Sequence, residues 1–197
     1  MRRLPIVCNQ VYTLFQEHPE TVNDFAKMSQ ISQAEADKFY IEHFRIHKWR
    51  KTGIIWWNLL DGWPQISDAV VDYFFEKKLA FHYIKRSQNP ILLMFDEPDG
   101  NRLPLYAANE FLEEKNVSFS VQNITKDILV IESEVTVDAN STKKIADLLY
   151  EDRCFYLISF ISDGVEYKNH YYTGLFRISF QDYLRDLEKS GLNDFTF

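Results

Sequence analysis

The first part of the chain combines helical spacing of apolar residues with helix-start signals. Pro19 is suited to a first helical turn, and it predicts a short helix that ends near Ser29. A capping box begins at Ser32, where Ser is followed three residues later by Glu, and it predicts a longer helix that ends near Arg50. A third helix is predicted over residues 76–87, because Asn and Pro follow its apolar face.

A short apolar run over residues 53–60 separates the second and third predicted helices. It is rich in β-branched and aromatic residues, and Gly and Pro bound it, which predicts a buried strand. Neighbouring residues on a strand point to opposite faces. One of Trp56 and Trp57 is therefore expected to pack into the body, and the other to face a cleft together with Asn58 or Asp61.

The pattern changes after Pro90, where short alternating runs replace helical spacing. Turn signals separate seven such runs, and this spacing is typical of a β-sandwich of the immunoglobulin type. The predicted strands are 91–95, 104–109, 117–123, 129–137, 141–146, 154–161 and 165–172.

A helix is predicted from Ser179 to Lys189, with Ser179 as its cap and Gly191 closing it. The chain is therefore expected to be α+β overall. Two domains are predicted, one over residues 1–89 and the other over residues 90–197, which combines the sandwich with the terminal helix.

The formal net charge of −7 argues against binding to a nucleic-acid backbone, because the chain has no basic stripe. Aromatic residues make up 16% of the chain. They supply buried area in a core and also stack on sugars or bases, so this content leaves both interpretations open.

No apolar stretch approaches the ~20 residues of a membrane helix, and no apolar segment of a signal peptide follows Met1. No membrane association is predicted, and the compartment stays open. Cys8 and Cys154 lack the spacing of a metal site. A disulfide between them is conceivable, but buried free thiols are the favoured interpretation.

His43 and His47 are spaced four residues apart on a predicted helix, as in some metal sites. The full His-Glu-x-x-His order is absent, since Phe44 follows His43. No Gly-rich phosphate loop occurs either. Neither a metal nor a cofactor is predicted.

Several of these motifs together resemble the C-terminal part of a glycoside hydrolase of family 2, of the β-mannosidase-like kind. The resemblance covers about residues 33–190. Its most specific part is the Trp-Asn-x-x-Asp-x-Trp-Pro cluster. The matching segments are Gly53-x-x-x-Trp57-Asn58, Asp61-x-Trp63-Pro64, Asp72-Tyr73, Ala80 with Tyr83 and Lys85-Arg86, and Asn169-His170-Tyr171.

The resemblance implies a fold and a role for each matching residue. The family's catalytic domain is a (β/α)₈ barrel, and the Trp-bearing run resembles its eighth strand. Trp57 matches the Trp that forms a platform under the bound sugar, where an indole face meets the C–H face of a pyranose. Asn58, Asp61 and Trp63 would form the rim or support of this platform. For Asp61, a simple loop cap is an equal alternative.

The family's two catalytic Glu residues are not expected in this chain. They lie on the fourth and seventh barrel strands, about 5–5.5 Å apart in retaining enzymes. The chain begins too late for the fourth strand, and the Glu of the seventh is expected at or before Met1. Asn109-Glu110 resembles the acid/base motif, but it lies in a predicted sandwich strand. No catalytic residue is therefore predicted, and we expect a fragment of a longer enzyme or a truncated reading frame.

The parent enzyme is expected to hydrolyse β-linked sugars, with mannosides favoured, and its partner is then a carbohydrate substrate. The alternative is a non-catalytic sandwich module that binds a glycan or a subunit. A single barrel strand would expose an edge and apolar faces. Packing by the predicted helices or self-association is expected to cover them.

Overall fold

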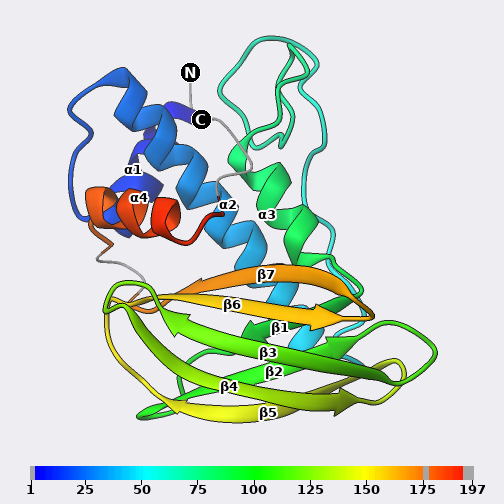
Figure 1. Cartoon of the computed structure of the whole chain (residues 1–197). Helices are drawn as coiled ribbons and strands as arrows, with labels where there is room; N and C mark the ends of the chain where they lie inside the picture. Colours follow the sequence, from blue (N-terminus) through cyan, green and yellow to red (C-terminus); the bar gives the residue numbers. More distant parts are fainter. Residues whose placement is uncertain (1–2, 175–177, 193–197) are drawn as a thin grey trace. The chain divides into compact units, whose positions relative to one another are not determined.

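The computed structural model describes residues 3–174 and 178–192 and shows an α+β chain (Figure 1). The helices are α1 (Arg3–Phe15), α2 (Val22–Ile46), α3 (Leu79–Ser87) and α4 (Phe180–Lys189). The strands are β1 (Ile91–Phe95), β2 (Arg102–Asn109), β3 (Lys115–Asn123), β4 (Ile128–Val137), β5 (Ser141–Leu149), β6 (Phe155–Ser162) and β7 (Val165–Tyr172). No helix in these described segments is both long and apolar enough to cross a membrane.

The described residues form two compact units. The helical unit contains the chain up to Tyr40, then Ile54–Lys85, then the C-terminal helix α4. The sandwich unit contains Ile41–Gly53 and Arg86–Gly174. The predicted division into domains at residues 89 and 90 remains a prediction.

The sandwich unit consists of two antiparallel sheets. One has the strand order β1-β2-β5 and the other has the order β4-β3-β6-β7. All seven predicted strands are confirmed, with small differences at their ends. Strand β3 shows why alternating apolar and polar residues predicted these strands. Its Val117, Phe119 and Val121 are buried, whereas the serines between them face outward.

Apolar side chains from both sheets form one core in this unit. Burial of these side chains removes apolar area from water, which is the main favourable term in folding. The buried members include Ile91, Leu93, Phe95, Leu103, Leu105, Val117, Phe119, Val121, Val137, Tyr156, Ile158 and Phe160.

In the helical unit, α2 is one continuous helix in place of two predicted ones. The break predicted between Ser29 and Ser32 is wrong, because Met28, Ile31 and Ala34 form an uninterrupted buried stripe across it. Packing of such a stripe outweighs a local capping signal. Helix α1 covers a segment for which no helix was predicted.

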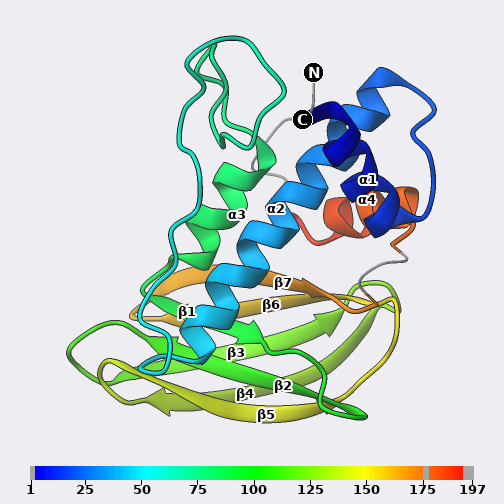
Figure 2. The ribbon, with the colours of Figure 1, turned by 180° about the vertical axis from the view of Figure 1, so that it is seen from behind.

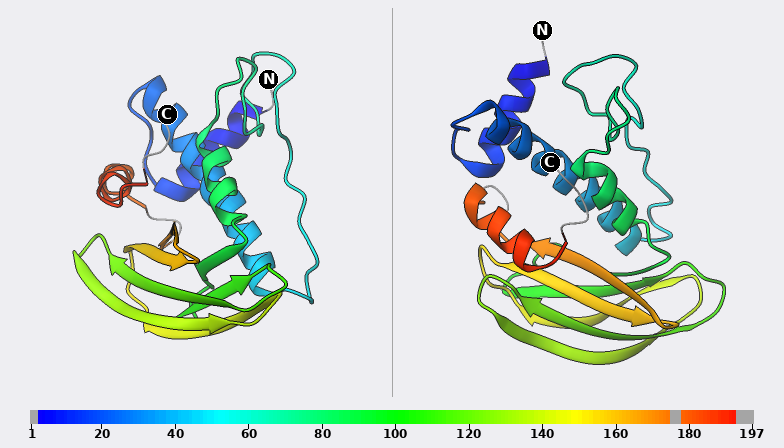
Figure 3. Two further views of the ribbon diagram at one scale, coloured as in Figure 1. Left: turned by 45° about the vertical axis from the view of Figure 1, so that its right-hand side comes forward. Right: turned by 45° about the horizontal axis from the view of Figure 1, so that its top comes forward.

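The terminal helix α4 is confirmed together with its cap. Ser179 has an extended backbone, and its Oγ accepts a hydrogen bond from the Asp182 N–H at 3.3 Å. Gly191 follows the helix with φ +68°, a conformation that glycine adopts without steric cost. Helix α4 lies beside α1 (Figure 3), where the rings of Phe15 and Phe180 meet edge to face at 5.8 Å.

The predicted strand over residues 53–60 is wrong. The segment is an irregular loop, and Ile55 is 93% exposed. Among the described residues, its backbone pairing with another part of the chain is limited to an isolated bridge between Leu60 and Val71 and a hydrogen bond from Val70 to Asn58. A strand requires a neighbour that satisfies its backbone N–H and C=O groups, and the described residues of the helical unit provide no further strand.

Both cysteines are free thiols. Cys154 is buried as expected, whereas Cys8 is exposed on α1, which corrects the prediction for that residue. Burial raises the pKa of the Cys154 thiol.

Candidate functional site

The four predicted site residues all lie on the long loop over residues 54–78 that precedes α3 (Figure 2). Trp57 and Trp63 are exposed, at 76% and 64%. Asn58 is half-buried and Asp61 is buried. The peptide bond between Trp57 and Asn58 is cis.

Backbone hydrogen bonds join the segment after Trp57 to the end of the loop. The Val70 N–H donates to the Asn58 carbonyl at 3.0 Å, and the Val71 N–H donates to the Leu59 carbonyl at 2.9 Å. In the other direction, the Asp61 N–H donates to the Val71 carbonyl at 3.1 Å. The residues that follow Trp57 are therefore fixed against a buried segment, while the indole itself remains accessible to solvent.

The Asp61 carboxylate is surrounded by donors from the same loop. Oδ1 accepts from Gln65 Nε2 at 2.9 Å. Oδ2 accepts from Ser67 Oγ at 2.7 Å and lies 3.4 Å from Lys78 Nζ. Burial by itself would raise the pKa of Asp61, but the hydrogen bonds from Ser67 and Gln65 and the charge of Lys78 outweigh it and lower the pKa.

The sequence pattern does not indicate the three partners of Asp61. Gln65, Ser67 and Lys78 are 4, 6 and 17 residues away along the chain. No motif links residue types at such spacings in an irregular loop. The only signal was the loop-cap interpretation of Asp61, which predicts internal donors without naming them.

A cavity of about 540 Å³ lies in the helical unit between the helices and this loop. Its walls include Gln30 and Gln33 of α2, and Ser67, Asp68 and Lys78 of the loop. Gln33 Nε2 donates to the Asp68 carbonyl at 2.7 Å, and Gln30 Oε1 accepts from the Leu79 N–H at 3.0 Å. Two glutamines of one helix thus hold both the loop and the start of α3.

Asp37, on the same helix, has an unusual environment. Burial, with a smaller contribution from the nearby charge of Asp68, raises its pKa to about 6, although a hydrogen bond with Gln33 lowers it in part. This half-buried carboxyl group near another acid is therefore close to its titration point under mildly acidic conditions.

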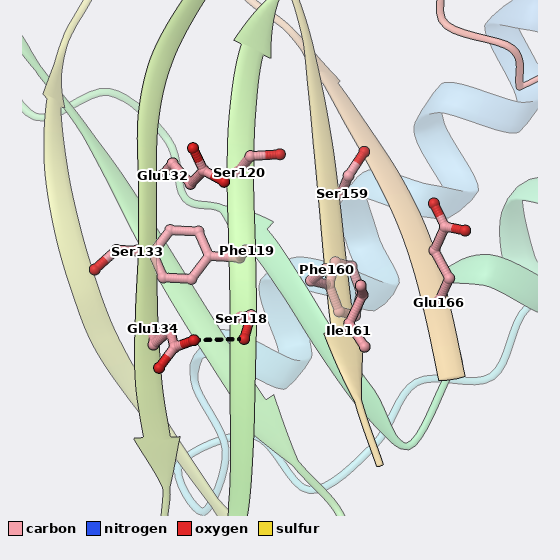
Figure 4. Close-up of a pocket in the computed structure, with 10 residues that line it drawn as sticks. All are labelled: Ser118, Phe119, Ser120, Glu132, Ser133, Glu134, Ser159, Phe160, Ile161 and Glu166. Carbon is pink, nitrogen blue, oxygen red and sulfur yellow. Dashed lines mark hydrogen bonds between the residues drawn. The ribbon is translucent and has the colours of Figure 1, made fainter. Parts of the chain in front are cut away.

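A second concave surface lies on the outer face of the four-stranded sheet in the sandwich unit (Figure 4). It has a volume of about 260 Å³. The serine hydroxyls of Ser118, Ser120 and Ser159 run along its centre, with glutamates on both sides. Ser118 Oγ donates to Glu134 Oε1 at 3.1 Å across β3 and β4.

His43 near the end of α2 and His47 just after this helix do not have the surroundings of a metal site. His43 and His47 have ring centroids 4.4 Å apart, but Lys51 Nζ lies 2.5 Å from His43 Nε2. Burial and the positive charges of Lys51 and His47 lower the pKa of His43. A lysine at the imidazole nitrogen opposes a cation there, and the described residues contain no group of three or more metal-ligating side chains.

Asn109 and Glu110 make internal contacts in the sandwich unit. Asn109 is fully buried, and its Nδ2 donates to the carbonyls of Glu113, Val137 and Asp138. Glu110 Oε2 accepts from Lys48 Nζ at 2.7 Å. Both side chains are used in internal contacts.

No family profile matches the sequence. β-Mannosidase B of Aspergillus terreus is 35% identical over 89 residues, which are 42% of this chain and 10% of that protein. The chain resembles part of a β-mannosidase. β-Mannosidase B of Aspergillus clavatus matches to the same extent, so the chain spans about a tenth of the length of the curated relatives it matches.

Solved structures agree with this resemblance at the level of the fold. The β-D-mannosidase of Dictyoglomus thermophilum superposes with a TM-score of 0.74 at 24% identity, covering 87% of this chain and 22% of that one. The exo-chitosanase of Amycolatopsis orientalis has a TM-score of 0.64 at 17% identity, covering 82% of this chain and 21% of that one. The resemblance to β-mannosidase-like glycoside hydrolases is thereby confirmed.

Proposed function

We propose that this chain is the C-terminal portion of a glycoside hydrolase that cleaves β-mannosides, and that it supplies the sugar platform but not the catalytic carboxylates. The helical unit is then the remnant of a (β/α)₈ barrel, and the sandwich unit is an immunoglobulin-like accessory domain. The similarity to β-mannosidases supports the parent reaction. The order β1-β2-β5 facing β4-β3-β6-β7 supports the immunoglobulin-like assignment.

The observation that carries the proposal is the exposure of Trp57 on an anchored segment. An indole that is 76% exposed offers its face to a ligand. The hydrogen bond from Val70 to the Asn58 carbonyl fixes the neighbouring residue. An aromatic ring that presents an apolar face at fixed position suits stacking against a sugar. Trp63 and Asn58 then border this platform.

Fluorescence titration of the purified chain with a β-manno-oligosaccharide tests the platform. We expect weak, millimolar binding that Trp57→Ala abolishes. Trp49→Ala is the matched control, because Trp49 is 70% exposed but lies in the sandwich unit. Equal effects of the two substitutions, or the absence of binding, would contradict the proposal.

An activity assay tests the missing carboxylates. We expect no hydrolysis of an aryl β-mannoside by this chain. Turnover that a single Glu substitution abolishes would show that the chain holds its own catalytic group and would overturn this part of the proposal. The reading frame upstream of Met1 is a further test, since a barrel with Glu on its fourth and seventh strands is expected there.

A second candidate function is glycan binding by the sandwich unit. The groove of Figure 4 favours it, because serine hydroxyls and glutamate carboxylates can exchange hydrogen bonds with sugar hydroxyls. Oligosaccharide binding that survives Trp57→Ala but is lost in Ser120→Trp, which fills the groove, would favour this candidate over the first.

A further inference from the structure

The environment of Asp61 limits what this residue can do. Its side chain is only 1% exposed. Gln65 donates a hydrogen bond to Oδ1, and Ser67 and Lys78 donate to Oδ2. A carboxylate that is buried and surrounded by internal donors has no free surface to offer to a sugar hydroxyl.

The segment that follows Asp61 depends on this carboxylate. In the described structure, residues 62–67 make no backbone–backbone hydrogen bond, and this segment includes Trp63. Two of its side chains, Gln65 and Ser67, reach back to Asp61. These contacts replace the backbone bonds that would fix a segment in a strand or helix.

Lys78 connects the same carboxylate to the start of α3. Its backbone N–H donates to the Val70 carbonyl at 2.9 Å, while its Nζ lies 3.4 Å from Asp61 Oδ2 and from Ser67 Oγ. Val70 in turn donates to Asn58, the neighbour of Trp57. Lys78 thus contacts Asp61 and Ser67, which flank the segment that carries Trp63, and also Val70, which bonds the residue after Trp57.

We propose that Asp61 and Lys78 are positioning residues. Their contacts, here called the lock, hold the loop bearing Trp57 and Trp63 in one conformation, and neither residue itself contacts the sugar. This inference rests on the proposed function only for the role of Trp57. The lock itself is a property of the free chain. Of the two roles expected for Asp61, at the rim or in the support of the platform, this inference selects the support.

Hydrogen–deuterium exchange of the full chain tests the lock without any ligand. The amides to follow are those of Asp61 and Val71, because both donate across the loop. We expect Asp61→Asn and Lys78→Met to raise their exchange rates at least tenfold, and Lys78→Arg to restore protection. Glu76→Gln is the matched control, because it removes one exposed negative charge from the same loop and leaves both amides protected.

Exchange in α4 and in the sandwich strands reports whether each variant is folded. If Asp61→Asn unfolds the chain, Ser67→Ala removes one hydrogen bond to the same carboxylate and gives the same expected local effect. Unchanged exchange at both amides in folded Asp61→Asn, or in folded Ser67→Ala in its place, would overturn the lock.

Affinity for the β-manno-oligosaccharide separates a positioning role from a purely structural one. We expect Asp61→Asn and Lys78→Met to weaken binding at least fivefold, and Lys78→Arg to rescue it. Faster exchange with unchanged affinity would overturn the positioning role. If the wild-type chain binds no mannoside, or binds it equally well with Trp57→Ala, the proposed function fails, and the exchange data alone decide whether the lock exists.

Discussion

Asn169 Nδ2 on strand β7 donates a hydrogen bond to Glu42 Oε1 on helix α2 at 2.9 Å, and both side chains are buried. Asn169 Nδ2 also donates to the Leu93 carbonyl of β1 at 2.9 Å, and its Oδ1 accepts from the His170 N–H. A single amide therefore joins the end of a helix to both sheets of the sandwich unit. The Asn-His-Tyr motif of the sequence thus has a structural role.

Loss of this amide is expected to destabilise the chain. Asn169→Ala leaves Glu42 and the Leu93 carbonyl with one partner fewer in a buried site, and an unsatisfied buried polar group costs about 1–3 kcal/mol. We expect a loss of about 2–4 kcal/mol in urea unfolding followed by circular dichroism. Asn116→Ala, at an exposed position of β3, is the control and should change stability by less than about 0.5 kcal/mol. Equal losses in the two variants would contradict this assignment.

The stability of the chain is expected to depend on the ionisation of Asp37. Its pKa in the folded chain is raised to about 6 from 3.8, so the folded state binds the proton more tightly than the unfolded state. The stabilisation that this protonation gives is fully present below pH 3.8 and is lost as the pH rises through about 6. Asp37→Asn should therefore stabilise the chain by about 1–3 kcal/mol at pH 8, with a smaller gain at pH 4.

Denaturant unfolding at both pH values measures this difference. The control is Asp127→Asn, at an exposed turn position with φ +55° that Asn tolerates. An Asp37→Asn gain that does not grow between pH 4 and pH 8 would show that the carboxyl is not held in its protonated form.

Neighbouring positions on β6 are expected to respond very differently to truncation. Phe160 is 1% exposed and stacks on Tyr167 with ring centroids 5.3 Å apart, whereas Ile161 is 49% exposed on the other face. Phe160→Ala should cost about 3–5 kcal/mol through lost burial and a residual cavity. Ile161→Ala should cost less than about 1 kcal/mol, and thermal unfolding of both variants checks the inside–outside assignment of the strand.

The cap of α4 is expected to contribute measurably to the stability of the helical unit. Ser179→Ala removes the acceptor of the Asp182 N–H and should cost about 1 kcal/mol, whereas Ser179→Asp should retain most of the stability. Hydrogen exchange of the first turn of α4 measures the effect locally. Identical protection in Ser179→Ala and the wild type would show that the Phe180 N–H contact with Glu17 holds the helix start instead.

The sequence by itself determined the sandwich, because its signals are local. The alternation of buried and exposed residues along β3 and the turn residues between strands do not depend on distant parts of the chain. The Ser179 cap and the closing Gly191 are likewise predicted from the residues next to them in the sequence. The spacing of one motif also predicted four candidate site residues; the structure places all four on one loop, and their role stays a prediction.

Only the tertiary structure decided the state of residues 53–60 and the role of Asp61. A β-propensity pattern becomes a strand only where another strand supplies hydrogen-bond partners, and the described helical unit offers none. Likewise, the capping box at Ser32 does not start a helix, because the packing of Ile31 and Ala34 continues α2 through this position. The donors that surround Asp61 come from residues up to 17 positions away, and folding alone brings them to one carboxylate.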